Sequence, residues 1–345
     1  MDILDVLTTA AKRDASDIIF SVGYPPMVRY QGELIPHGNE KLDADLAKKL
    51  IYSILNDEQK TLFEEHRELD LSIQVKNVGR FRVNVFRQQG FVGGAFRIIA
   101  GNIPTLEKLK VPQALHELAQ TPRGLVLVTG PTGSGKSTLL AAFINEINSN
   151  RRAHIVTIED PIEFIHPPYK SCITQREIGK DSNTFTNALK YVLRQNPDVI
   201  LLGEMRDLET IAAAVTLAET GHLVLSTLHT QSAAGTVDRI VDVFPPYQQQ
   251  QIRVQLSMTL KAVVCQQLLA STDGFSRVPA REIMVTNAAI ANLIRDGKSH
   301  MLFGIIETSA KDGMITMDRS IQNLLAAGKI SHEVARSKMT RLKLG

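Results

Sequence analysis

The chain has 345 residues, 43% of them hydrophobic, which is enough to bury a full core and to form two domains. It has 39 Lys and Arg residues and 36 Asp and Glu residues, and the resulting net charge of +3 gives no electrostatic support for nucleic-acid binding. The two widely separated cysteines, Cys172 and Cys265, argue against a disulfide framework or a structural zinc site, and fit a reducing cytosol.

The N-terminal segment gives no sign of export. Residues 1–13, MDILDVLTTAAKR, carry acids early and have no long apolar core, so we expect no signal peptide. No stretch of the sequence approaches the roughly 20 apolar residues that a membrane span needs. We therefore expect a cytoplasmic protein that meets a membrane only through a partner.

Short helical and strand patterns alternate over the first hundred residues. An amphipathic helix opens the chain, and helical spacing returns over residues 42–55. Alternation typical of strands, interrupted by breaks such as Pro25-Pro26 and Gln31-Gly32, occurs over residues 17–22, 27–30, 79–86 and 90–99. Residues 1–100 are thus predicted to form a small α+β domain.

A linker and a second domain are predicted after residue 100. Residues 101–112 carry Gly101, Pro104 and several charges between two patterned regions. Near-continuous apolar runs, typical of strands buried on both faces of a parallel sheet, then alternate with helical patterns. Residues 113–345 are therefore predicted to form an α/β domain, mostly helical after about residue 246. Its apolar runs are residues 125–129, 154–158, 199–202, 223–227 and, near the C-terminus, 278–285.

The second domain opens with a phosphate-binding motif. Residues 130–138, GPTGSGKST, satisfy G-x-x-x-x-G-K-[ST], with the strand LVLVT before them and the helical pattern STLLAAFINEI after them. Polyphosphate needs inward backbone N–H groups and the positive end of a helix dipole, and Gly133 and Gly135 allow that close approach. Lys136 would charge-pair with the β- and γ-phosphates, and Ser137 would hold Mg²⁺. The nucleotide-binding residues are predicted to be Thr132, Gly133, Ser134, Gly135, Lys136, Ser137 and Thr138.

An acid ends the apolar run 199–202, in the sequence DVILLGE. In open α/β sheets ligands bind at the carboxyl ends of the strands, which puts Glu204 on the phosphate side. Glu204 could hold Mg²⁺, partly through water, or polarise the attacking water. The alternative is that it caps the next helix, but Asp207 already fits that N-cap.

Three more acids follow the run 154–158, in the sequence EDPIE. This is more carboxylate than Mg²⁺ needs, so Glu163 is the candidate for orienting or deprotonating water, with Glu159 as its competitor. A solvated acidic loop is the alternative for each of them.

Two histidines flank the run 223–227. Seven extended residues span roughly 23 Å, so His222 and His229 cannot easily share one phosphate or metal. His229, at the carboxyl end, could sense the γ-phosphate, whereas His222 is expected to be structural or to lie at an interface.

Arginines mark one face of the first domain. Alternation over residues 79–86 puts Arg80 and Arg82 on one face and apolar residues on the other, and Arg97 ends the neighbouring strand pattern. Such a basic face is either solvated or closes over the nucleotide and stabilises charge on the transferring phosphoryl group.

From Met1 to about Lys338, the sequence resembles the secretion-type ring ATPases, and within them the PilT-like type IV pilus retraction ATPases. GPTGSGKST is similar to the family's Walker A motif, IVTIEDPIEF to its Asp box, DVILLGEMRD to its atypical Walker B motif and GHLVLSTLHT to its His box. The N-terminal stretches ASDIIFSVG, PPM and RFRVNVF match as well. Four motifs in order are far more specific than one phosphate loop.

The resemblance implies a PAS-like first domain, a RecA-like second domain and a cytoplasmic homo-hexamer with ATP sites between domains. It implies ATP and Mg²⁺ as ligands, Glu204 and Glu163 in catalysis, and nucleotide contacts from Arg82 and Arg97. It also implies a motor for pilus retraction and twitching motility, peripheral at the inner membrane. Its partners would be the inner-membrane platform protein, pilin through that protein, and a paralogous retraction ATPase.

Two departures from the family pattern leave other functions open. Residues 289–295 read AIANLIR, with Ala291 where members carry the first Arg of a motif needed for retraction, and residues 17–21 lack a usual His. The alternatives are an accessory retraction paralogue or a nucleotide-gated regulatory module. Pilus-assembly and type II secretion ATPases usually carry a four-cysteine motif absent here, and a nucleic-acid translocase would share only the RecA-like core.

Overall fold

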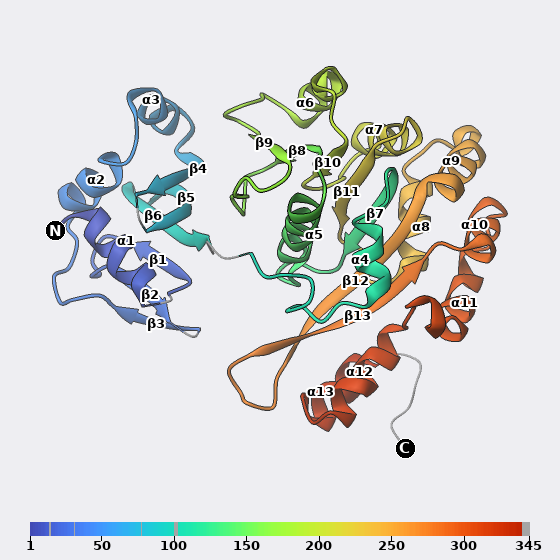
Figure 1. Cartoon of the computed structure of the whole chain (residues 1–345). Helices are drawn as coiled ribbons and strands as arrows, with labels where there is room; N and C mark the ends of the chain where they lie inside the picture. The colour runs from blue at the N-terminus through green and yellow to red at the C-terminus, as the bar shows by residue number, and fades with distance from the viewer. Residues whose placement is uncertain (14, 31, 77, 100–102, 340–345) are drawn as a thin grey trace. The chain divides into compact units, whose positions relative to one another are not determined.

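The computed structural model of the protein describes residues 1–13, 15–30, 32–76, 78–99 and 103–339. The chain divides into two compact units, Met1–Asn102 and Ile103–Gly345 (Figure 1). None of the described helices is long and apolar enough to cross a lipid bilayer.

The first unit contains a six-stranded antiparallel sheet with the strand order β3-β2-β1-β6-β5-β4. Its strands are β1 (Asp17–Phe20), β2 (Met27–Tyr30), β3 (Glu33–Pro36), β4 (Glu68–Val75), β5 (Gly79–Gln88) and β6 (Phe91–Ile99), and its helices are α1 (Ile3–Lys12), α2 (Ala44–Tyr52) and α3 (Asp57–His66). Apolar side chains of α1, α2 and one sheet face form its core. The predicted α+β unit is confirmed, whereas its likeness to a PAS domain stays a prediction.

The second unit is built on a seven-stranded sheet with the order β13-β12-β7-β11-β10-β8-β9. Only the β12–β13 pair is antiparallel. The strands are β7 (Gly124–Thr129), β8 (His154–Glu159), β9 (Cys172–Glu177), β10 (Val199–Leu202), β11 (Leu223–Leu228), β12 (Leu260–Ala270) and β13 (Arg277–Val285).

Helices cover both faces of this sheet (Figure 1). The helices are α4 (Gln113–Leu118), α5 (Lys136–Asn150), α6 (Phe185–Val192), α7 (Leu208–Glu219), α8 (Ala233–Asp242), α9 (Pro246–Thr259), α10 (Ala288–Arg295), α11 (Leu302–Thr308), α12 (Met317–Ala326) and α13 (His332–Lys338), with 3₁₀ turns at Leu193–Gln195, Ser299–Met301 and Ala310–Asp312. The predicted parallel α/β sheet and helical C-terminal region are confirmed.

Alternate residues of the central strands enter separate cores. Leu125 and Leu127 of β7 pack with α7, α8 and α9, whereas Val126 and Val128 pack with α4 and α5. Every residue of β7, β10 and β11 is therefore buried. This two-faced burial is the physical reason for the continuous apolar runs in the sequence.

Four strands, β3, β4, β9 and β12, were not predicted from the sequence. All four residues of β3 are exposed, and its apolar alternation is short. Strand β4 directly follows α3, whose C-cap Arg67 has a left-handed φ of 64°. Strand β9 lies at the sheet edge and is mostly polar. The described region after residue 246 is mostly helical, as predicted, but it also contains the long strand β12, which begins at Leu260 directly after α9 and pairs with β7.

The predicted linker, residues 101–112, divides at the boundary of the second unit. Residues 101 and 102 lie outside the described residues. Further along, Leu106 is fully buried and Val111 is 9% exposed, and both pack into the core that also contains α4 and α5. From Leu106 onward, this connecting segment is therefore a packed part of the second unit.

Candidate active site

The phosphate loop follows β7 and depends on glycine at three positions. Gly130, Gly133 and Gly135 have φ angles of 141°, 75° and 83°, which side chains disfavour. A Cβ on Gly130 would also lie 2.1 Å from the backbone oxygen of Gln266 in β12. The loop conformation therefore requires glycine for its backbone angles and, at Gly130, for close packing as well.

The first turn of α5 is open to an anion. The helix begins at Lys136, and its N-cap, Gly135, offers no side-chain oxygen to the first N–H groups. The hydroxyl of Ser134 is buried without a hydrogen-bond partner in the described part of the chain. Thr132 and Gly133 are exposed. These polar groups fit an anionic ligand such as a phosphate.

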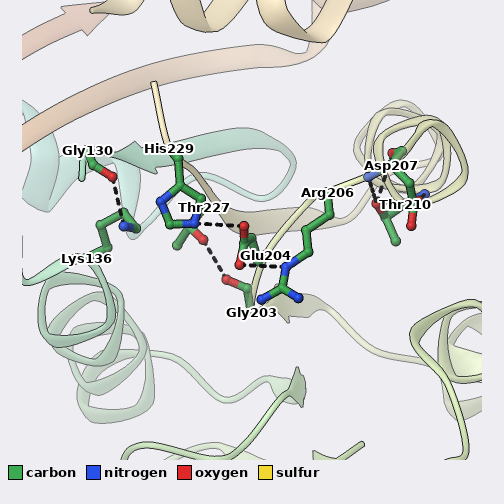
Figure 2. A network of polar contacts seen from close by, with 9 residues as sticks. All are labelled: Gly130, Lys136, Gly203, Glu204, Arg206, Asp207, Thr210, Thr227 and His229. Atoms are coloured by element: carbon green, nitrogen blue, oxygen red, sulfur yellow. Dashed lines mark hydrogen bonds and ion pairs between the residues drawn. The ribbon is translucent and has the colours of Figure 1, made fainter. Parts of the chain in front are cut away.

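The ammonium of Lys136 lies against the same loop. Its Nζ donates to the backbone oxygens of Gly130 at 2.9 Å, drawn in Figure 2, and of Pro131 at 3.1 Å. Burial lowers the pKa of Lys136, and the carboxylates of Glu204 and Glu163 oppose that shift. The charges of two acids that follow different strands thus both reach Lys136. This agrees with the prediction that Glu204 and Glu163 lie on the phosphate side of the sheet.

Glu204 lies two residues beyond the end of β10, and both of its oxygens are engaged (Figure 2). Oε1 is 2.8 Å from Nε2 of His229, and Oε2 accepts from Nε of Arg206 at 2.9 Å. The adjacent backbone is fixed, because the hydroxyl of Thr227 donates to the oxygen of Gly203 at 2.7 Å. The carboxylate is therefore held between the ends of β10 and β11.

The next helix does not need Glu204 as a cap. Asp207 is the N-cap of α7, and its carboxylate accepts from the backbone N–H of Thr210 at 2.8 Å (Figure 2). The reading of Glu204 as a helix cap is therefore wrong.

The two competing acids of the loop after β8 differ in environment. Glu163 is exposed, whereas Glu159 accepts from the Thr157 hydroxyl at 2.6 Å and lies 3.4 Å from the amide of Gln175. Burial raises the pKa of Glu159 to about 7, although these hydrogen bonds lower it. Glu159 is thus a half-buried carboxyl with a raised pKa, and Glu163 is open to water.

The two histidines lie at opposite ends of β11, as strand geometry predicts. His229 meets Glu204. His222 contacts the backbone oxygen of Leu217 in α7 through Nδ1 at 3.0 Å. This contact joins the last turns of α7 to the residue before β11, and a structural or interface role for His222 stays a prediction.

Comparison with known proteins places this geometry in a family. The model of the type II/IV secretion system protein family matches residues 2–323. The chain belongs to this family. It is 48% identical to the "Type IV pilus retractation ATPase PilT" of Pseudomonas aeruginosa over 98% of both chains. It is 41% identical to the "Type IV pilus ATPase PilU" of the same organism, over 97% of this chain and 88% of that protein.

A solved family structure supports the nucleotide reading. The crystal structure of "the Pilus Retraction Motor PilT and Bound ADP" superposes with a TM-score of 0.92 at 42% identity, over 98% of this chain and 96% of that one. Family membership and these ATPase relatives support ATPase activity and nucleotide binding in this chain.

A magnesium ion shared between the protein and the phosphates is predicted near the loop. No cluster of three His, Cys, Asp or Glu residues able to hold a metal occurs within the described ranges. Mg²⁺ is commonly held by one or two protein groups together with phosphate oxygens and water, and Ser137 and Glu204 are the groups predicted here. Their part in metal binding stays a prediction.

The predicted arginines belong to the first unit and are register partners in β5 and β6. Phe81, Val83 and Val85 fill the opposite, buried face of β5, as alternation predicts. Nε of Arg97 donates to Asp17 at 3.0 Å, whereas Arg82 is exposed and has no side-chain partner among the described residues. A role toward the nucleotide stays a prediction for both arginines.

Ala291, where the sequence departs from the family motif, lies in α10, whereas the phosphate loop joins β7 to α5. Ala291 is half-buried, Ile290 and Ile294 are buried, and Asn292 and Arg295 are exposed. The helix is N-capped by Asn287, whose side chain accepts from the N–H of Ile290. The substitution is therefore accommodated without loss of the helix.

Sequence reasoning missed two buried polar residues behind the phosphate loop. Gln266 of β12 bonds to the loop and to Arg281 of β13. The signal was the pair Gln266-Gln267 inside the otherwise apolar stretch AVVCQQLLA. A buried glutamine in a central strand needs partners, but the sequence does not show which they are.

Proposed function

We propose that this chain is an ATP-hydrolysing motor that powers type IV pilus retraction, and through it twitching motility. The observation that carries the proposal is the position of the Glu204 carboxylate. It is held by His229 and Arg206 beyond the carboxyl end of β10, and the phosphate loop follows the carboxyl end of β7 in the same sheet. An acid so placed can act on water or metal at the γ-phosphate. The full-length similarity to PilT supports retraction as the work performed.

Nucleotide binding would rest on the phosphate loop. The backbone of Thr132–Thr138 and the open end of α5 would bind the phosphates, and Lys136 would exchange its two backbone acceptors for phosphate oxygens. Mg²⁺, held by Ser137 and partly through water by Glu204, would neutralise charge on the phosphates.

Hydrolysis would rest on the acids that follow the carboxyl ends of β8 and β10, Glu163 and Glu204, a group that we call the acidic edge. Glu163 orients or deprotonates water in this proposal, because it is exposed whereas Glu159 is enclosed by Thr157 and Gln175. His229 would sense the γ-phosphate through its contact with Glu204. Arg82 and Arg97 would stabilise charge on the transferring phosphoryl group.

The motor would act as a cytoplasmic homo-hexamer at the inner membrane. The family resemblance supports a membrane platform protein as its direct partner, with pilin reached through that protein. A paralogous retraction ATPase is a further expected partner, as the similarity to both PilT and PilU suggests. Nucleic acid is not expected to bind.

Phosphate release by the purified full-length protein tests the proposal. Glu204→Ala should lower the Mg²⁺-dependent turnover by about a hundredfold or more, because a group acting on the transferring phosphoryl is lost. Glu209→Ala, an exposed acid in the first turn of α7, is the matched control and should leave turnover unchanged. Equal phosphate release by wild type and Glu204→Ala would contradict the motor function.

Ala291 supports a second candidate, an accessory retraction ATPase. Both candidates hydrolyse ATP, so gene deletion and a count of surface pili must separate them. Excess pili with lost surface motility would identify the principal retraction motor. Motility that persists until a paralogue is also removed would identify the accessory role, and bald cells would indicate assembly. Ala291→Arg should raise retraction in the accessory case.

A further inference from the structure

A buried glutamine connects the phosphate loop with the β12–β13 hairpin. Gln266 is 4% exposed, and its Nε2 donates to the backbone oxygen of Ser134 at 2.6 Å. Its Oε1 accepts from Nε of Arg281 at 2.7 Å. Both ends of one amide are thus used, the donor on the loop and the acceptor on β13.

Arg281 continues the connection to a second segment. It lies directly opposite Gln266 in the β12–β13 ladder and is 7% exposed. Its NH1 donates to the backbone oxygen of Leu109 at 2.9 Å. Leu109 belongs to residues 103–112, the connecting segment through which the chain passes from the first unit to the second.

Arg281 is a buried cation that has no ion pair within the described part of the chain. Burial lowers the pKa of Arg281 to about 10. A buried guanidinium without a carboxylate costs free energy, and a neutral side chain would fill the space with less penalty. What the guanidinium offers instead is a rigid fork that binds two acceptors at once.

We propose that Gln266 and Arg281 are positioning residues that couple the phosphate loop to the connecting segment. The proposal rests on nucleotide binding at the loop, as proposed above. Arg281 polarises the amide of Gln266 and so strengthens its bond to Ser134, because hydrogen bonds in a buried chain reinforce one another. A nucleotide that orders the loop around Ser134 thereby tightens the same chain of bonds at Leu109.

The connecting segment carries amides that report on this coupling. Leu109 N–H bonds to the oxygen of Thr105 at 3.1 Å, Lys110 N–H to Glu107 at 2.9 Å and Val111 N–H to Leu106 at 3.3 Å. Their opening exposes them to hydrogen exchange without global unfolding. A stronger hold on the Leu109 oxygen should therefore slow their exchange.

Hydrogen exchange of the full-length protein, with and without saturating ADP and Mg²⁺, tests the coupling. In the wild type, ADP should slow exchange of the Leu109, Lys110 and Val111 amides by about fivefold. This is the change expected if the tightened bonds stabilise the closed segment by about as much as one net hydrogen bond. In Gln266→Met, which removes both bonds at similar volume, bound ADP should leave their exchange unchanged. Gln267→Met, on the opposite face of the same strand, is the matched control and should behave as wild type.

Nucleotide affinity supplies the second readout. Gln266→Met should raise the Kd for ADP about fivefold, because the loop loses one hydrogen bond. Gln266→Glu keeps an acceptor for Arg281 and loses only the donor to Ser134, so it keeps the chain folded if the methionine variant fails to fold. It too should bind ADP more weakly and leave the connecting segment unresponsive.

The outcomes separate this inference from the proposed function. A wild type that binds ADP without slower exchange at residues 109–111 overturns the coupling and leaves ATP binding intact. Coupling that survives in Gln266→Met and Gln266→Glu also overturns it, since Gln266 would then be only a packing residue. A wild type that binds no nucleotide overturns both proposals.

Discussion

The two halves of the candidate active site are built from different parts of the chain. The phosphate loop is shaped by backbone: three glycines with positive φ angles and carbonyl groups that accept from Lys136 and Gln266. The acidic edge is shaped by side chains, through the contacts of Glu204 with His229 and Arg206. Changes in the loop should therefore act on folding and binding, whereas changes at the edge should act on turnover in an intact fold.

The largest effect is expected where the backbone half is packed most closely. Gly130→Ala puts a Cβ 2.1 Å from the backbone oxygen of Gln266 and forces a φ of 141° on alanine. Neither backbone can move far inside the sheet, so the free energy of unfolding should fall by about 3–5 kcal/mol. Chemical denaturation measures this loss.

Gly133→Ala is the matched control on the same loop. Its φ of 75° also disfavours a side chain, but no atom lies within 4 Å of the added Cβ. Only the conformational cost applies, and stability should fall by about 1–2 kcal/mol. Equal losses in the two variants would show that packing against β12 does not fix the loop.

Glu159, at the end of β8, is a side chain of the acidic half that we expect to act on stability. Its pKa is about 7 in the folded chain against 4.5 in the unfolded chain, so the folded state binds this proton more tightly. The resulting stabilisation is full below pH 4.5 and is lost as the pH rises toward 7. The free energy of unfolding should fall by up to about 3 kcal/mol across this window.

Glu159→Gln should remove that part of the pH dependence. Glutamine stays neutral and can still accept from Thr157. Urea titrations between pH 4.5 and pH 7 should give a flatter stability profile for this variant than for the wild type. The exposed Glu163→Gln is the control and should retain the wild-type slope. An unchanged slope in Glu159→Gln would mean that the half-buried carboxyl of the wild type is already ionised across this pH range.

The sequence predicted the parts of this site whose signals are local. The phosphate loop is one continuous motif, and the strands β7, β8, β10 and β11 are apolar runs that only two-faced burial explains. The strand-end rule also put Glu204 and His229 on the phosphate side. Their contact needs the parallel register of β10 and β11, which pairs Leu202 with Ser226 and which no single segment specifies.

The features that the sequence did not predict depend on distant partners. The buried position of Gln266 depends on its hydrogen-bond partner, Ser134, which is 132 residues away. Strand β12 falls within the region that was predicted to be mostly helical. The exposed strand β3 and the edge strand β9 bury few side chains, so their sequences show no clear pattern of apolar residues.

The smallest expected effects separate the two groups that hold Glu204. His229 and Arg206 contact its two oxygens at nearly equal distances, 2.8 and 2.9 Å, but their side chains are 51% and 71% exposed. An exposed guanidinium is screened by water and contributes little. His229→Ala should lower kcat for phosphate release about tenfold, and Arg206→Ala only about twofold, with KM nearly constant in both.

Both variants should keep the wild-type free energy of unfolding within about 0.5 kcal/mol, since each changes a half-exposed or exposed side chain. That pairing of lost turnover with unchanged stability is what distinguishes the side-chain half of the site from the phosphate loop. If His229→Ala instead unfolded as readily as Gly130→Ala, the contact with Glu204 would serve the fold of the sheet edge. If Arg206→Ala lost more turnover than His229→Ala, the arginine would be the group that orients Glu204.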